Sequence, residues 1–162
     1  MPTPHAAAVD NAADRHPWES HHRFCDVGAA QGMASAQLAH RHPHLRGTGF
    51  DLPQVGPIFE EFIAEQRLGD RVRFVGGDFF IDPLPDADVY LMGHILHDWS
   101  LREKRALLGR AYDALPDGGA LIVYDAIIDD ERRANALAPL MSLNMLIETL
   151  AGADYTGADR QA

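Results

Sequence analysis

Five short apolar runs alternate with segments of helical spacing, and this alternation constrains the fold more than any other feature of the sequence. The runs are residues 23–27, 48–52, 72–75, 88–92 and 121–124. The fourth run has almost no polar residues, as expected of a strand that is covered on both faces. Strands that alternate with helices form parallel sheets, so the sequence predicts an α/β fold. We expect a Rossmann-like parallel sheet with helices on both faces, in the strand order 3-2-1-4-5.

The segments between these runs predict the helices. Residues 33–40 are rich in Ala and Leu, and apolar residues at positions 58, 59, 62 and 63 recur at helical spacing. Ser100 and Glu103 match a capping box, which predicts a helix that begins after Ser100. The apolar face expected for that helix consists of Leu108, Ala111, Tyr112 and Leu115. A final apolar helix is expected over residues 140–150.

Composition limits the function classes. The 162 residues amount to one domain; we expect a loose lead-in over residues 1–20 and the domain over 21–162. The net charge of -10 disfavours nucleic acid and anionic membranes as partners. No signal peptide is recognisable in the first 20 residues, and no window approaches the about 18 apolar residues of a spanning helix, so a cytoplasmic protein is expected. The single cysteine, Cys25, permits no internal disulfide.

Carboxylates follow the predicted strands. Open parallel sheets bind ligands at the carboxyl ends of their strands, and four of the five ends carry an acid at or beside the turn. This pattern suggests a ligand rich in hydroxyl and amino donors, such as a nucleoside. Asp51 lies 23 residues beyond Gly28, close to the spacing of about 20 at which an acid binds ribose hydroxyls. The alternative for Asp51 is a solvated turn residue before proline.

The glycine loop after the first run separates possible cofactors. It reads G-x-x-x-G from Gly28 to Gly32, with Ala30 where a dinucleotide fold usually places its middle glycine. That glycine admits a pyrophosphate close to the backbone. The loop pattern therefore disfavours NAD as the cofactor. It neither favours nor disfavours a nucleoside cofactor that lacks a pyrophosphate.

Five segments together resemble a known enzyme family. FCDVGAAQG, GFDLP, GDFF, DVYLMGHILHDW and ALPDGGALIVYDAII are similar, in order and spacing, to S-adenosylmethionine-dependent O-methyltransferases. The similarity is to the metal-independent group that includes plant caffeate and flavonoid enzymes, hydroxyindole methyltransferases and bacterial polyketide O-methyltransferases. It covers about residues 18 to 157. The HDW element, combined with GDFF and DLP, is its most specific part.

The resemblance implies a set of S-adenosylmethionine-binding residues. The loop residues that match the methionine-binding loop are Asp26, Gly28 and Gly32. The pair that matches the ribose contacts is Asp51 and Leu52. The segment that matches the adenine contacts comprises Gly77, Asp78 and Phe79. Met141 and Met145, four residues apart, are interpreted either as core residues or as lining of the acceptor pocket.

The resemblance also implies a general base. His97 matches the family's catalytic histidine, and Asp125 matches the acid that orients it. Asp154 matches a second acid less closely, because the residues before it depart from the usual Pro-Gly-Gly. A phenol with a pKa of about 10 needs such a base to become a nucleophile at neutral pH. The expected substrate is a small aromatic hydroxylated molecule. The alternative for His97 is a histidine packed on Trp99.

We expect no metal site. His40, His42 and His44 are interpreted as surface histidines, and His94 and His97 are expected to lack a nearby third ligand.

The resemblance implies a homodimer for full-length family members, which carry an N-terminal helical domain and two further strands. We therefore expect this chain to be incomplete at both ends, and Gly93 stands where plant members have a lysine. Two alternatives remain open: a cofactor-binding piece without activity, and an NAD-dependent oxidoreductase.

Overall fold

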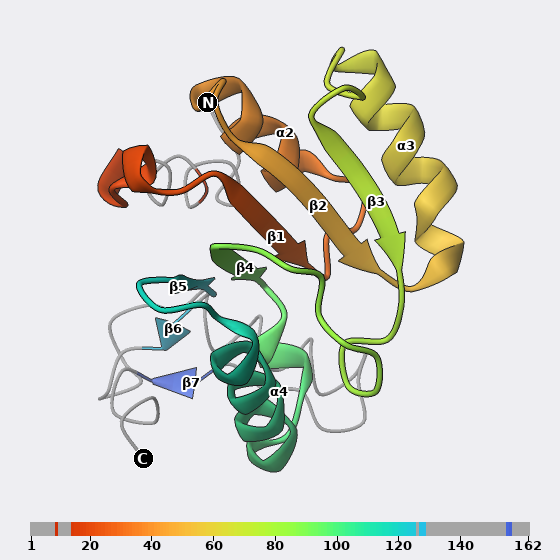
Figure 1. The fold of residues 1–162 in the computed structure, drawn as a ribbon. Coiled ribbons are helices and arrows are strands. Elements are labelled where there is room, and N and C mark those ends of the chain that lie inside the picture. Colours follow the sequence, from red (N-terminus) through yellow and green to blue (C-terminus); the bar gives the residue numbers. More distant parts are fainter. Residues whose placement is uncertain (1–8, 10–13, 126, 129–154, 157–162) are drawn as a thin grey trace.

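The computed structural model describes residues 9, 14–125, 127–128 and 155–156. Its centre is a five-stranded sheet in the order β3-β2-β1-β4-β5, in which every neighbouring pair is parallel (Figure 1). The strands are β1 (Arg23–Val27), β2 (Arg46–Asp51), β3 (Val72–Gly76), β4 (Val89–Gly93) and β5 (Ala120–Tyr124). Each overlaps its predicted run, and the predicted α/β class and strand order are confirmed.

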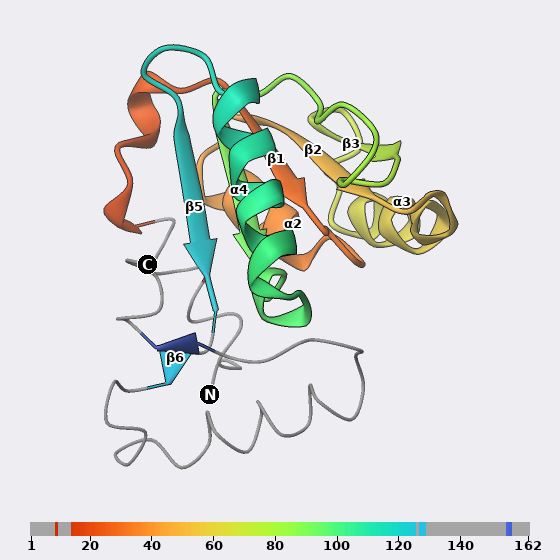
Figure 2. The same ribbon diagram turned by 90° about the horizontal axis from the view of Figure 1, so that it is seen from below.

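Helices cover both faces of this sheet. The α-helices are α2 (Met33–Arg41), α3 (Gly56–Glu65) and α4 (Leu101–Ala114). The 3-10 turns are η1 (Trp18–Ser20), η2 (Pro53–Val55) and η3 (Leu96–Asp98). Figure 2 shows α4 in front of the sheet and α2 behind it. No helix among the described residues is long and apolar enough to cross a membrane.

The alternation of side chains along β1 explains how one strand serves both faces. Cys25 and Val27 belong to the cluster that Leu107 and Ala111 of α4 join. Phe24 points to the opposite face, where it packs in the cluster of Leu38 from α2. All six residues are buried. Because successive strand residues face opposite sides, the apolar run of β1 lies between two helical layers.

A glycine in β2 allows α3 to pack closely on the sheet. A Cβ atom on Gly49 would lie 2.2 Å from the ring of Phe59. Phe59 is fully buried and packs with Ile63 of the same helix. Any larger residue at position 49 would force α3 away from the sheet.

The segment before β1 contributes to the core. Trp18 in η1 is fully buried and packs with Phe24, Leu38 and Leu45. No core residue was predicted in this segment, because its sequence shows little periodicity. Trp18 anchors the end of the lead-in against the face of the sheet that α2 covers.

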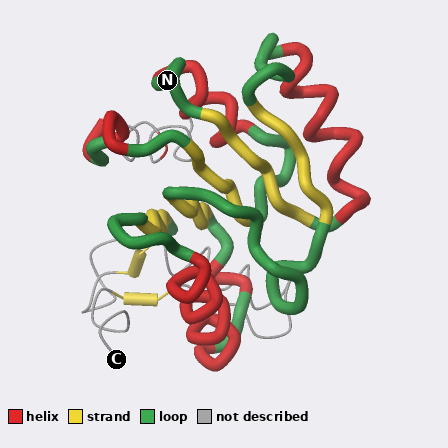
Figure 3. The backbone as a smooth tube through the Cα atoms, viewed as in Figure 1, coloured by secondary structure: helices red, strands yellow, loops and turns green. Residues whose placement is uncertain are grey.

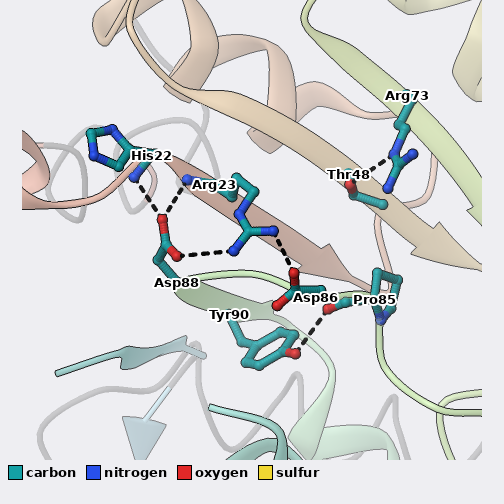
Figure 4. A network of polar contacts seen from close by, with 8 residues as sticks. All are labelled: His22, Arg23, Thr48, Arg73, Pro85, Asp86, Asp88 and Tyr90. Atoms are coloured by element: carbon teal, nitrogen blue, oxygen red, sulfur yellow. Dashed lines mark hydrogen bonds and ion pairs between the residues drawn. The ribbon is translucent and has the colours of Figure 1, made fainter. Parts of the chain in front are cut away.

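A polar network fastens the amino ends of β1 and β4 (Figure 4). The carboxylate of Asp88 accepts hydrogen bonds from the backbone amides of His22 (2.7 Å) and Arg23 (2.8 Å). The Arg23 guanidinium forms ion pairs with Asp86 and with Asp88. These contacts fix the edge of the sheet opposite the carboxyl ends of the strands.

Two details differ from the sequence-based expectations. The expectation that Tyr112 lies on the buried face of α4 is wrong: its exposed fraction is 78%. The buried positions are Leu107 and Ala111, four residues apart, and Tyr112 lies about 100° further around the helix, in solvent. A separate parallel pair, β6 (Ile127–Ile128) with β7 (Tyr155–Thr156), was not predicted. The helix expected over residues 140–150 lies outside the described residues.

Candidate active site

The loop after β1 approaches the carboxyl ends of the strands in a strained conformation. In Figure 3 the strands pass into loops at this edge. Positive φ angles occur at Gly28 (75°), Ala30 (47°) and Gly32 (90°). A Cβ atom on Gly28 would lie 2.1 Å from the side chain of Ile95, so only glycine fits there. The backbone of the loop therefore comes close to the segment that follows β4.

Asp51, at the end of β2, holds this loop in place. One carboxylate oxygen accepts a hydrogen bond from the amide of Ala30 at 2.9 Å, and the other accepts from the amide of Leu52 at 2.7 Å. Asp51 is half-buried, whereas Leu52 is exposed. Because each carboxylate oxygen has two lone pairs, Asp51 can still accept hydrogen bonds from hydroxyl groups of a ligand.

A cavity of about 370 Å³ opens beside the loop. Its lining includes Asp26, Gly28, Ala30, Gly93, His94 and Tyr124. A Cβ atom on Gly93 would lie 2.1 Å from the Tyr124 ring, so this ring occupies the space next to Gly93. Of the eight residues expected to bind the cofactor, Asp26 and Gly28 line this cavity directly.

Asp26 is a buried acid whose carboxylate belongs to the cavity wall. It accepts a hydrogen bond from the Ser35 hydroxyl at 2.8 Å. Burial raises the pKa of Asp26 to about 6, and the nearby Asp51 charge adds to this, whereas the bonds from Ser35 oppose it. Burial also raises the pKa of Tyr124. A cationic group in the cavity would favour the ionised form of Asp26.

The turn after β3 is ordered by its own backbone and by α4. The amide of Gly77 donates to the carbonyl of Asp51 at 2.9 Å, which places this turn beside the end of β2. The Asp78 carboxylate accepts from the amide of Phe80 at 2.8 Å. Arg110 of α4 donates to the carbonyl of Phe79 at 2.9 Å. Asp78 and Phe79 therefore lie at the carboxyl edge, outside the wall of the cavity.

His97 lies in η3, after β4, and its side chain is 7% exposed. Its Nδ1 atom lies 3.9 Å from Asp125 Oδ1, and its Nε2 atom lies 3.4 Å from Asp98 Oδ1. The side chain of Asp125 is fully buried. In the part of the chain that the structure describes, Trp99 makes its ring contacts with Phe79 and Phe80, not with His97.

The expectation that His94 and His97 lack a third ligand is wrong. Each of His94, His97 and Asp125 offers one ligand atom, and these atoms lie within 4.8 Å of one another. The register pairs Gly93 with Tyr124, so the residues that follow β4 and β5 meet. A spacing along the sequence cannot reveal this contact, because Asp125 comes from the neighbouring strand. The remaining predicted site residues, Asp154, Met141 and Met145, lie outside the described residues.

Three residues of the cavity wall were given no cofactor-binding role from the sequence. They are His94, Ile95 and Tyr124, which line the cavity together with the glycine loop. Tyr124 was assigned only to the fifth strand. The signal that could have found all three is their place at the carboxyl ends of neighbouring strands.

Comparison with known proteins identifies the family. The model of the O-methyltransferase domain matches residues 7–161. The chain belongs to this O-methyltransferase family. It is 51% identical, over 142 residues, to the tetracenomycin polyketide synthesis 8-O-methyl transferase TcmO of Streptomyces glaucescens; the match covers 88% of this chain and 42% of that protein.

Two further relatives extend this comparison of the O-methyltransferase chain. The N,N-dimethyltransferase OxyT of Streptomyces rimosus is 48% identical over 75% of the chain and 35% of its own length. The crystal structure of human N-acetylserotonin methyltransferase in complex with SAM superimposes with a TM-score of 0.87 at 29% identity, over 96% of this chain and 44% of that one. The chain thus spans less than half the length of each of these three relatives.

Proposed function

We propose that this chain binds S-adenosylmethionine and transfers its methyl group to a hydroxyl of a small aromatic acceptor. The observation that carries the proposal is the arrangement of His97 and Asp125. Both side chains are buried at the carboxyl edge of the sheet, which also carries a cavity lined by the glycine loop. The family match and the human relative bound to SAM support the choice of cofactor.

The residues at the carboxyl edge fit this cofactor. Its sulfonium and amino groups are cationic, and Asp26 provides a buried carboxylate in the cavity wall. Asp51 offers carboxylate lone pairs to ribose hydroxyls at the end of β2. The turn that contains Gly77, Asp78 and Phe79 lies next to Asp51, where the adenine would extend.

His97 acts as the general base in this proposal. S-adenosylmethionine supplies an electrophilic methyl carbon, so the protein must align the acceptor oxygen and remove its proton. Asp125 faces Nδ1 of His97 and favours the tautomer in which Nδ1 carries hydrogen. The lone pair on Nε2 would then take the hydroxyl proton, while the acceptor oxygen bonds to the methyl carbon and the carbon–sulfur bond breaks to release S-adenosylhomocysteine. Asp98, 3.4 Å from Nε2, stabilises the imidazolium that results.

Replacement of His97 by alanine tests this role. We expect methyl transfer from labelled S-adenosylmethionine to a panel of phenols to fall by about 10²–10⁴-fold. The dissociation constant for S-adenosylmethionine should stay within about twofold, because His97 does not line the cavity. The variant His40→Ala, an exposed histidine of α2, is the matched control. Turnover that survives in His97→Ala, or cofactor affinity lost together with turnover, would contradict the role.

The name of OxyT favours a second candidate, methyl transfer to nitrogen. An aromatic amine is neutral at pH 7 and can attack before it loses a proton, so its methylation depends less on a base. Aniline and phenol acceptors should therefore be compared in the native chain and in His97→Ala. Loss of phenol methylation alone supports O-methylation.

Cofactor binding without turnover on any acceptor would instead support the alternative that the chain binds the cofactor without catalytic activity. Roles for Asp154, Met141 and Met145 stay predictions.

A further inference from the structure

His94, His97 and Asp125 come together from two segments, the connection after β4 and the end of β5. His94 follows β4, His97 lies in η3, and Asp125 follows β5. The amide of His94 donates to the carbonyl of Tyr124 at 2.9 Å, which continues the pairing of β4 with β5 by one residue. One ligand atom from each of the three side chains lies within 4.8 Å of the other two.

His94 adopts a backbone conformation that favours glycine. Its φ angle is 55°, in the left-handed region that residues with a side chain seldom occupy. The ring of His94 lies with its centroid 5.6 Å from the ring of His97 and 5.9 Å from that of Tyr124. A strained residue that directs an imidazole toward two other ligand groups indicates a functional constraint at this position.

We propose that these three side chains form a binding site for a divalent transition-metal ion such as Zn²⁺. Two imidazoles and one carboxylate are a ligand set that Zn²⁺ accepts, with a fourth position open to water. In a tetrahedral site the ligand atoms lie about 3.3 Å apart, given metal–ligand bonds of about 2.0–2.1 Å. The separation of 3.9 Å between His97 Nδ1 and Asp125 Oδ1 needs only a small side-chain adjustment.

A second observation supports the same site. When Nδ1 of His97 binds the ion on the side of Asp125, Nε2 carries hydrogen and faces Asp98 Oδ1 at 3.4 Å. Metal-bound histidines usually donate their other ring N–H to a carboxylate or carbonyl, which fixes the ring. Asp98 is therefore placed as an outer partner of a metal-bound His97.

Metal binding and proton transfer exclude one another at His97. With Nδ1 bound to the ion and Nε2 carrying hydrogen, no lone pair remains to take the proton of the acceptor. Zn²⁺ is therefore an inhibitor of methyl transfer, a consequence that rests on the proposed function. The binding site itself does not depend on that function, so the two are tested separately.

Titration of the tag-free chain with Co²⁺ tests the site without an activity assay. We expect one equivalent to give the visible absorption of a four- or five-coordinate ion with nitrogen and oxygen ligands, and Zn²⁺ to displace it. His94→Gly keeps the positive φ without strain and removes only the ligand. We expect this variant to be at least as stable as the native chain and to bind Co²⁺ at least about tenfold more weakly. Asp125→Asn should weaken binding similarly.

The matched control is the double variant His42→Gln, His44→Gln, which removes a second group of histidines. Unchanged Co²⁺ affinity in this control supports the assignment. Retained affinity in His94→Gly, or loss of binding in the control instead, would overturn it. Inhibition by Zn²⁺ is measured afterwards on an acceptor that the native chain methylates, with EDTA to reverse it. Methylation that persists under saturating, spectroscopically confirmed metal binding would contradict the inhibitory role and leave the binding result intact.

Discussion

Asp26 lowers the free energy of unfolding and also forms part of the cavity wall. Its pKa of about 6 results chiefly from burial, so at pH 7 the folded chain carries a buried carboxylate held by one Ser35 hydroxyl. Asp26→Asn removes the charge and keeps an oxygen for that hydroxyl. We expect the free energy of unfolding at pH 7 to rise by on the order of 1 kcal/mol. The affinity for S-adenosylmethionine should fall at least tenfold, as denaturant titration and calorimetry would show.

The pH dependence of the free energy of unfolding is a second test of Asp26. The folded-state pKa of Asp26 lies above its ordinary value of 3.8, so between about pH 4 and 6 the folded chain binds more protons than the unfolded chain. The free energy of unfolding that Asp26 contributes therefore decreases as the pH rises through this window. Asp26→Asn should lack that decrease. A less stable variant with unchanged pH dependence would show that the carboxylate is a structural group.

At the scale of single residues, the sequence indicated the acids and, through the family resemblance, the pairing of Asp125 with His97, but not the approach of His94 to both. Asp26, Asp51 and Asp125 follow from their positions at strand ends, because the turn after a parallel strand is visible in the sequence. The contact of Asp125 with His94 is not visible, since it depends on the register of β4 and β5. The same register places the Tyr124 ring over Gly93.

Among the elements, α4 connects the capping signal in the sequence with the site. The Ser100 side chain accepts from the amide of Glu103, and the Glu103 carboxylate accepts from the amide of Ser100 at 2.9 Å, so the predicted capping box is confirmed. The helix it begins carries Arg110, which holds the turn after β3. The helix α4 therefore joins the capping box at its start to the turn after β3.

Ser100→Ala tests this element. We expect the free energy of unfolding to fall by about 1 kcal/mol, because the amide of Glu103 loses its acceptor. Arg102→Ala, an exposed change in the same turn, should shift stability by less than about 0.5 kcal/mol. Equal losses in the two variants, measured by urea titration, would show that the capping box contributes nothing of its own.

The positions of the helices and strands followed from the periodicity of the sequence. Which face of each element is buried followed only in part. A short apolar run between turn residues marks a strand wherever the sheet is covered on both faces, as in β4. In α4 the pattern included Tyr112, whose ring has enough apolar surface to mimic a core residue. The position of Trp18 escaped notice because a single aromatic residue in an irregular segment has no period.

In the molecule as a whole, the polar network that stabilises the sheet and the candidate active site lie at opposite edges of the sheet. The amino edge is fastened by Asp88 to the start of β1 (Figure 4). The carboxyl edge carries the glycine loop, the cavity and His97. The chain spans less than half the length of these two relatives. Its carboxyl edge nevertheless brings together Asp26, Asp51 and Asp125, the acids of the proposed site. The question for the whole molecule is whether that edge binds the cofactor.

Calorimetric titration of the native chain with S-adenosylmethionine answers it, with circular dichroism on the same sample to establish folding. We expect saturable binding with one equivalent, at least tenfold weaker in Asp51→Ala and unchanged in Asp113→Ala, an exposed acid of α4. S-adenosylhomocysteine should bind and NAD should not. A folded native chain that does not bind S-adenosylmethionine, or binding that Asp51→Ala leaves unchanged, would rule out cofactor binding at this edge.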